Sequence, residues 1–201
     1  HKGLDFETTP TRFTEIPGIE AGAFRTVPVL RDGDRVLADS FQIALYLEKA
    51  YPDRPSLFAG EGGKALSRFI EKWAQAVLVG YIGSSLLLDI HAVLDAEDQV
   101  YFRSSREKRF GRVLEETAKG REDRLEDFRA ALTPLRLMLN DQPFIGGQEP
   151  LFADYIAAGM FQWARIVSAF LLLAEEDPVA AWFERCLDLH DGLGRRVPAA
   201  A

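Results

Sequence analysis

Apolar and polar positions alternate in two short runs near the start of the chain. Residues 25–30 (Arg-Thr-Val-Pro-Val-Leu) and 35–38 (Arg-Val-Leu-Ala) flank a polar tetrapeptide. Asp32-Gly33 between two apolar runs is a strong hairpin signal because both residues tolerate positive φ. Pro28 cannot donate a ladder hydrogen bond, which suits the start of a strand. The pattern therefore predicts two antiparallel strands joined by a tight turn.

The period changes to that of a helix directly after the second run. Phe41, Ile43, Ala44, Leu45 and Leu47 recur at helical spacing. Asp39 or Ser40 is the expected N-cap, since a side-chain oxygen there accepts from the first N–H groups. Free N–H groups at a helix start also attract a carboxylate.

Everything after residue 60 has a helical pattern. Two prolines, Pro52 and Pro55, followed by glycines mark a linker before it. The spacing predicts helices over 66–88 (with an interruption near Gly80 or Gly83), 98–119, 121–139 (kinked or restarted at Pro134), from 153 onward, and 177–189.

Composition narrows the classes of function. The chain has 201 residues, 47% hydrophobic and 27% charged, with a formal net charge of −7. No basic domain is present, so we expect no nucleic-acid partner. The most apolar stretches, 76–88 and 166–174, are too short or interrupted to span a bilayer. Cys186, the single cysteine, excludes an internal disulfide, indicates a reducing compartment and reads as inert core.

Two kinds of chemistry lack the residues that they need. Residues 60–64 are glycine-rich but have neither the glycine spacing nor the Ser/Thr after lysine of a phosphate loop. His1, His91 and His190 are far apart along the chain, and no metal-ligand spacing occurs. We therefore predict no metal site.

The segment from Val27-Pro28 to Asp39-Ser40 closely resembles the second half of the thioredoxin-like domain of cytosolic glutathione transferases. The resemblance implies a cis Val27–Pro28 peptide and glutathione as co-substrate. It implies that the main chain of Val27 pairs with the cysteinyl part of glutathione. Asp39 and Ser40 would hold the γ-glutamyl carboxylate.

A second motif with the same resemblance lies at 144–158. Phe144-Ile-Gly-Gly precedes Ala-Asp154-Tyr at the start of an apolar helix. In the family a serine or threonine three residues before this aspartate caps the helix reciprocally. Leu151 stands there instead, which removes a cap typically worth ~1 kcal/mol. We expect Asp154 to be structural, capping alone or through other contacts.

The resemblance implies the fold class α/β plus all-α. A partial thioredoxin-like domain (1–59) would precede an all-helical C-terminal domain (60–195) and a tail (196–201). In the family, "His-Lys-Gly" typically ends the first helix, and Leu4–Glu7 reads as the following strand. We therefore expect one strand and one helix to be missing from the front. The serine, tyrosine or cysteine that activates the glutathione sulfur would lie upstream of His1, so the catalytic residue is unknown.

Further short segments resemble sequences of the bacterial β-etherase class and of the related etherase-like class of wood-degrading fungi. These segments lie at residues 89–91, 120–125, 153–164 and 188–195. The resemblance implies attack of the glutathione thiolate on a small aromatic electrophile, with cleavage of a β-aryl ether as the specific version. A homodimer in the cytoplasm is the expected setting.

The electrophile would bind between the domains. The candidates for this pocket are Trp73, Tyr81, His91, Phe144 and Trp163. His91 could orient a leaving phenolate. For each of them ordinary core packing is the alternative interpretation, because aromatic residues at helical spacing are usually core.

Two other functions stay open at this point. The chain could be a non-catalytic protein of the transferase fold that binds aromatic ligands, since a fold alone does not establish activity. It could also be an incomplete chain without a functional glutathione site. Turnover of a chromogenic electrophile separates the enzyme from the binding protein.

Overall fold

The computed structural model describes residues 1–200; the last residue of the expected tail, 201, lies outside them. A β-hairpin of β1 (Val29–Asp32) and β2 (Arg35–Ala38) forms the sheet. Val29 pairs with Ala38 and Asp32 with Arg35. The hairpin is therefore confirmed, but its two turn residues are Gly33 and Asp34. Gly33 supplies the positive φ of 57°, and Asp32 ends the strand.

The segment before the hairpin has little regular structure. Its one element is the short 3-10 segment η1 (Ile16–Gly22). The prediction of a strand at Leu4–Glu7 is wrong. These residues have no strand partner among those described, and most of them are exposed. An extended run without a hydrogen-bonded neighbour is not a strand, whatever its residue pattern.

Helix α1 (Ser40–Ala50) follows the hairpin and carries its own small core. Phe41 and Ala44 are buried together with Leu57 and Phe58 of the linker. The ring of Phe152, at the start of α9 (Phe152–Val167), lies 5.5 Å from Phe41 and 5.6 Å from Phe58, edge to face with both. This aromatic cluster attaches the first part of the molecule to the second.

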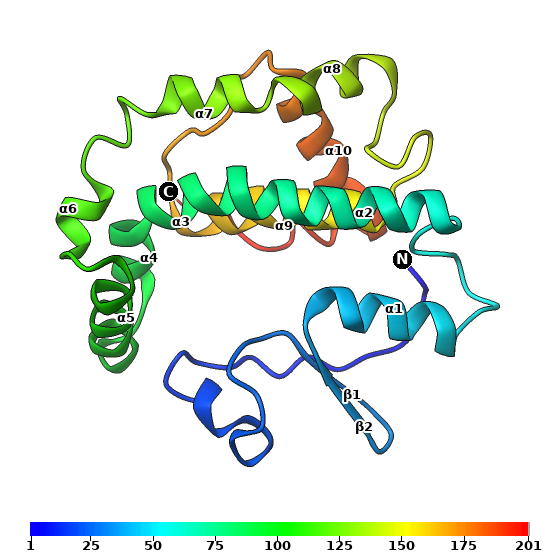
Figure 1. Cartoon of the computed structure of the whole chain (residues 1–201), viewed down its shortest axis with the longest axis horizontal. Coiled ribbons are helices and arrows are strands. Elements are labelled where there is room, and N and C mark those ends of the chain that lie inside the picture. The colour runs from blue at the N-terminus through cyan, green and yellow to red at the C-terminus, as the bar shows by residue number, and fades with distance from the viewer. Residues whose placement is uncertain (201) are drawn as a thin grey trace.

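The second part is entirely helical (Figure 1). Helices α2 and α9 lie side by side at its centre, and α7, α8 and α10 cover one side of them in Figure 1. The remaining elements are α2 (Glu61–Ala74), the π-helical turn η2 (Gln75–Val79), α3 (Gly80–Ser85), α4 (Leu87–Val93), α5 (Ala96–Phe110), α6 (Leu114–Ala118), α7 (Leu125–Ala131), α8 (Thr133–Asp141) and α10 (Pro178–Gly192).

The helix boundaries correct several predictions. The helix expected over 98–119 is two helices, because Gly111 takes a left-handed φ of 70° and ends α5. The helix over 66–88 is interrupted by the π turn at 75–79, directly before Gly80, in agreement with the predicted interruption near that residue. It bends by 61° between Ser85 and Leu87. The restart at Pro134 is confirmed, with Leu132 between α7 and α8.

A continuous apolar core fills the helical part. Its largest fully buried side chains include Trp182, Phe102, Leu78 and Ile82. In the part of the chain that the structure describes, no single helix is long and apolar enough to cross a membrane. The bent pair Glu61–Ser85 and Leu87–Val93 reaches that threshold by length and composition only.

Candidate functional site

The open end of the hairpin brings the residues of the first motif together. Because Val29 pairs with Ala38, Val27-Pro28 and Asp39-Ser40 extend from the same end of β1 and β2. The Val27–Pro28 peptide is cis. The side chain of Val27 is 52% exposed, and Pro28, Asp39 and Ser40 are also exposed. The geometry presents the main chain of Val27 beside a helix start, both accessible to a ligand.

The N-cap residue of α1, Asp39, occupies some of the backbone donors at this helix start and leaves others free. The Oδ1 atom of Asp39 accepts hydrogen bonds from Phe41 N at 2.9 Å and Gln42 N at 3.0 Å. Within residues 1–200, neither the N–H nor the hydroxyl of Ser40 has a hydrogen-bond partner. The donors for an anion are therefore those of Ser40. The carboxylate of Asp39 is an acceptor and suits a cation.

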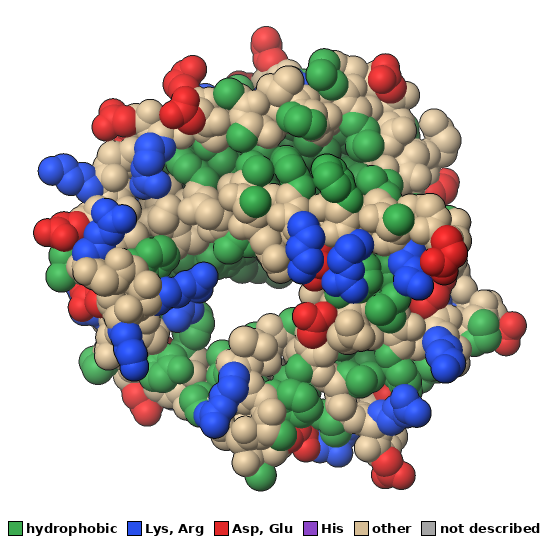
Figure 2. Space-filling model, in the orientation of Figure 1, with side chains coloured by type: hydrophobic (Ala, Val, Ile, Leu, Met, Phe, Trp, Pro, Cys, Tyr) green, Lys and Arg blue, Asp and Glu red, His purple; other side chains and the backbone are tan. Residues whose placement is uncertain are grey.

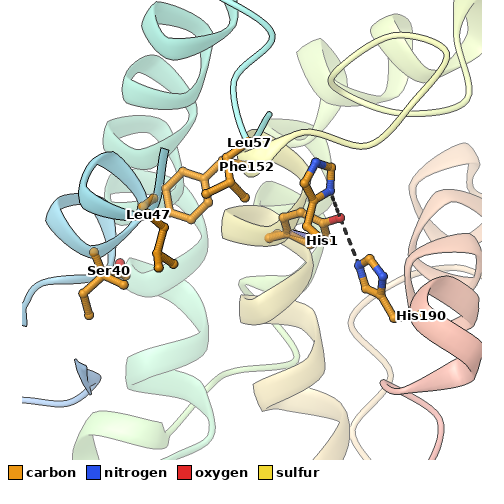
Figure 3. A pocket seen from close by; sticks show the side chains of 9 residues that line it. His1, Ser40, Leu47, Leu57, Phe152 and His190 are labelled. Atoms are coloured by element: carbon orange, nitrogen blue, oxygen red, sulfur yellow. Dashed lines mark hydrogen bonds between the residues drawn. The ribbon is translucent and has the colours of Figure 1, made fainter. Parts of the chain in front are cut away.

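A pocket of about 250 Å³ begins at Ser40 and runs between α1 and α9. Figure 3 shows Ser40 on one side of it, His1 and His190 on the other, and Leu47 and Phe152 between them. Its walls are almost wholly apolar. The further lining residues are Ile43, Ala44, Leu57 and Tyr155.

A chain of hydrogen bonds forms the polar end of this pocket. The Tyr155 hydroxyl lies 2.8 Å from His1 Nδ1 and 3.1 Å from His190 Nε2 (Figure 3). His1 Nε2 lies 2.8 Å from the Ser56 carbonyl oxygen. The carbonyl can only accept, so His1 Nε2 donates to it. A neutral His1 then accepts at Nδ1 from Tyr155, and the Tyr155 oxygen accepts from His190 Nε2–H.

Burial favours the neutral forms of Tyr155 and His190. It raises the pKa of the Tyr155 hydroxyl, and it lowers the pKa of His190. A tyrosine and a histidine shifted in these directions both hold no charge near pH 7. In this arrangement the donors of Tyr155 and of His190 Nε2 are used within the chain of hydrogen bonds, and Nδ1 of a neutral His190 is an acceptor.

The five residues predicted for the electrophile pocket lie elsewhere. Trp73, Phe144 and Trp163 are half-buried against the helical core. Tyr81 is buried, stacks on Phe128 at 4.3 Å between ring centroids and donates to the Arg121 carbonyl at 2.7 Å. None of these residues, nor His91, lines either of the two described pockets.

Sequence reasoning missed Phe152, Tyr155 and His190 as pocket residues. Tyr155 follows Asp154 in the second motif, which was a usable signal. His1 and His190, far apart in the sequence, have ring centroids 6.4 Å apart, and only the fold could show this. No group of three or more His, Cys, Asp or Glu side chains in residues 1–200 is placed to hold a metal ion.

Asp154 fastens the segment before α9 to α10. Its carboxylate is completely buried and accepts from Ile145 N at 2.7 Å, Gly146 N at 2.9 Å, Leu151 N at 3.0 Å and Trp182 Nε1 at 2.9 Å. The expected hydroxyl of the capping box is absent at Leu151. Asp154 caps the helix alone through Leu151 N, and its other three contacts add to this.

Cys186 packs partly buried against the helical core. Burial raises the pKa of its thiol to about 12. The thiolate, the reactive form, is therefore rare near neutral pH. This agrees with an inert core cysteine.

The chain matches two sequence models of one family. The model described as "Glutathione S-transferase, C-terminal domain" matches residues 65–189, and the one described as "Glutathione S-transferase, N-terminal domain" matches residues 1–50. A curated relative, the "Glutathione S-transferase-like protein ustS" of Aspergillus flavus, is 29% identical over 139 residues. The match covers 64% of this chain and 50% of the relative, so the chain spans about half the length of that protein.

Solved structures have the same fold. Glutathione transferase GSTFuA3 from Phanerochaete chrysosporium superposes with a TM-score of 0.72 at 28% identity, covering 95% of this chain and 80% of that one. The glutathione S-transferase CsGST63524 of Ceriporiopsis subvermispora, solved in complex with glutathione, gives a TM-score of 0.74 at 23% identity. That superposition covers 97% of this chain and 82% of the other.

Proposed function

Because the chain belongs to the glutathione S-transferase family, we propose that it is a glutathione transferase that binds glutathione at the open end of the hairpin. Its fold is a small thioredoxin-like unit followed by the helical C-terminal domain of that family. The observation that carries the proposal is the juxtaposition of the exposed Val27-Pro28 segment and the Asp39-Ser40 helix start.

Two parts of glutathione, the cysteinyl residue and the γ-glutamyl group, have complementary groups there. The main chain of Val27, two residues before β1, pairs with the cysteinyl residue. The N–H and hydroxyl of Ser40 donate to the γ-glutamyl carboxylate, supported by the positive end of the α1 dipole. The Asp39 carboxylate accepts from the γ-glutamyl ammonium. The resemblance implied that both Asp39 and Ser40 hold the γ-glutamyl carboxylate. In this proposal Ser40 binds the carboxylate and Asp39 binds the ammonium group.

The pocket that starts at Ser40 supports an aromatic electrophile as second substrate. Leu47, Leu57 and Phe152 offer an apolar wall for an aryl ring. In the specific version, a β-aryl ether, the glutathione thiolate forms the new C–S bond, the ether C–O bond breaks and a phenolate leaves with the electron pair. Tyr155, at the polar end of this pocket, would donate to that phenolate by turning its O–H from His1 Nδ1 to the leaving oxygen.

Three parts of this account stay predictions. The first is a serine, tyrosine or cysteine that activates the glutathione sulfur. The homodimer and the cytoplasmic location also stay predictions from the resemblance.

A turnover experiment tests the proposed function. The chain is incubated with glutathione and a β-aryl ether that releases a fluorescent phenol. The parallel assay uses 1-chloro-2,4-dinitrobenzene, and each is repeated with Ser40→Ala and with Ser104→Ala, an exposed control on α5. Glutathione-dependent turnover that Ser40→Ala lowers and Ser104→Ala keeps supports the transferase. Binding of the ether without turnover of either substrate supports the non-catalytic binding protein instead.

A further inference from the structure

The chain bends sharply at the end of α10, and His190 lies in this bend. The helical path ends at Leu189, whose ψ is 149°. His190 and Asp191 then take left-handed conformations with φ of 53° and 58°, and Gly192 follows with φ of 73°. Glycine adopts this conformation at little cost, but two consecutive residues with side chains rarely do. Backbone strain of this kind concentrates where the placement of a side chain is used.

Packing against the neighbouring helices holds the bend in place. Gln162 of α9 donates from Nε2 to the Gly194 carbonyl at 2.8 Å. A Cβ at Gly194 would lie 3.0 Å from Leu187 Cα, so the chain after the bend packs directly on α10. The direction of the His190 side chain is thus fixed before any ligand arrives.

His190 contacts the hydroxyl of Tyr155 on the side opposite His1. Its Nε2 atom lies 3.1 Å from the Tyr155 oxygen (Figure 3). Because the Ser56 carbonyl sets the tautomer of His1, Tyr155 donates to His1 and accepts from His190. When the O–H of Tyr155 turns to a ligand, the hydrogen bond to His1 is lost and the one from His190 remains.

This remaining hydrogen bond gains strength during the proposed reaction. As the ether C–O bond breaks, the phenolate oxygen takes the electron pair and accepts a hydrogen bond from Tyr155. Burial raises the pKa of the Tyr155 hydroxyl, so the proton stays on Tyr155. Donation to an anion makes the Tyr155 oxygen a better acceptor, and hydrogen bonds in such a chain strengthen one another. The contact with His190 is therefore stronger in the transition state than in the ground state.

We propose that His190 is a positioning residue for the departing phenolate: its Nε2–H holds the Tyr155 oxygen so that the O–H reaches the leaving oxygen. The proposal rests on the proposed function, since it needs an aryl ether in the pocket that begins at Ser40. Its effect is largest for weakly acidic phenols, because these leave as less stable anions and gain more from a hydrogen bond.

The test compares His190→Gln with His190→Met in the full chain. Both side chains have a similar length and the same left-handed backbone, but only glutamine has an N–H donor at its end. Position 190 is exposed, so neither exchange enters the core. Two β-aryl ethers, one releasing phenol and one releasing the more acidic 4-nitrophenol, are turned over at saturating glutathione. Urea unfolding of each variant measures its stability separately.

For the phenol ether, kcat of His190→Met should fall roughly fivefold, the net effect of one hydrogen bond, at unchanged KM. The 4-nitrophenol ether should be affected less, and His190→Gln should restore kcat. In a Tyr155→Phe background the exchange between Gln and Met should make no difference. Equal kcat for His190→Gln and His190→Met, equal losses for both ethers, or a difference that persists without the Tyr155 hydroxyl would overturn the proposal.

Binding of 4-nitrophenolate, followed by its visible absorption band, separates this proposal from the proposed function. If the unmodified chain turns over neither ether, the transferase reaction fails, and the phenolate titration decides on His190. His190→Met should then bind 4-nitrophenolate several-fold more weakly than His190→Gln. Equal binding by the two variants, or no binding by the unmodified chain, overturns the role of His190.

Discussion

Val29 pairs with Ala38 across the antiparallel hairpin, and this register sets Pro28 and Asp39 at the same end. The exposed Val27 main chain and the start of α1 are thereby presented together without any contribution from the helical part. The glutathione site that we propose is built from these local contacts. Its electrophile pocket, in contrast, needs α1 and α9 to meet.

Asp39 has two separable roles, one in capping and one in binding. Asp39→Asn keeps an oxygen that accepts from Phe41 and Gln42, and asparagine tolerates the φ of 72° at this position. We expect the free energy of unfolding to stay within about 0.5 kcal/mol, as for a neutral cap exchange. Glutathione affinity should fall by roughly tenfold, because about 1.5 kcal/mol is lost with a charge-assisted hydrogen bond. Urea unfolding and calorimetry measure the two quantities. An unchanged affinity would show that Asp39 is only a cap.

Asp154 should be among the most sensitive positions for stability. Asp154→Asn replaces one acceptor oxygen by an NH₂ group that faces the N–H donors of the carboxylate. We expect a loss of about 3 kcal/mol or more, since a buried charge-assisted network is broken. The exposed Asp141→Asn at the end of α8 is the control. Similar urea midpoints for the two variants would contradict the structural role.

The Arg136–Asp177 pair predicts a defined acid sensitivity. Burial alone would raise the pKa of Asp177, but hydrogen bonds from Arg136, at 2.7 Å, and from Val179 N outweigh it and lower the pKa. A carboxyl with a lowered pKa adds stability above its unfolded pKa of about 3.9 and loses it as pH falls through the folded value.

Arg136→Met should therefore cost about 1.5–3 kcal/mol at pH 7, the range for hydrogen bonds to a charged group. The difference from the unmodified chain should shrink below about pH 4, where Asp177 becomes protonated in both proteins. Thermal unfolding at pH 7 and pH 3 checks this, with the exposed Arg112→Met as control. If Arg136→Met lowered the stability by the same amount at both pH values, Asp177 would not be the cause of its effect.

Two glycines should respond in opposite directions to the same change. A Cβ at Gly146 would lie 2.6 Å from Leu151 Cγ and 2.7 Å from the Glu149 carbonyl oxygen, so Gly146→Ala forces the loop before α9 apart. Gly159 lies exposed in the middle of α9 with open space around it. Gly159→Ala should stabilise the chain by about 0.5–1 kcal/mol through helix propensity. Melting temperatures that move in the same direction would contradict this reading of the loop.

The hairpin and the helix cap could be predicted from the sequence because each depends on residues that are close together in the chain. Gly33 provides the hairpin turn and Asp39 provides the cap, and both needed only a few neighbours. Gly111 shows the limit of periodicity: apolar positions continue past it, but its left-handed conformation ends the helix. The strand expected at Leu4–Glu7 failed for a related reason, since a strand depends on a partner far along the chain.

The pocket was less accessible to sequence reasoning. The pattern pointed to aromatic residues along the helices, such as Tyr81 and Trp163, which pack in or against the core. The hydrogen-bond chain of the pocket instead joins residues 154 and 35 positions apart, His1 with Tyr155 and Tyr155 with His190. Such pairs arise from tertiary packing, and no period in the sequence encodes them.

The most direct measurement of the central claim is a calorimetric titration of glutathione into this 201-residue chain and into its Ser40→Ala and Ser104→Ala variants. We expect micromolar-to-millimolar binding by the unmodified chain and by Ser104→Ala. Ser40→Ala should bind at least tenfold more weakly, since hydrogen bonds to a carboxylate contribute about 1.5–3 kcal/mol. Equal affinity in all three proteins, or no binding by the unmodified chain, would contradict the site at the open end of the hairpin.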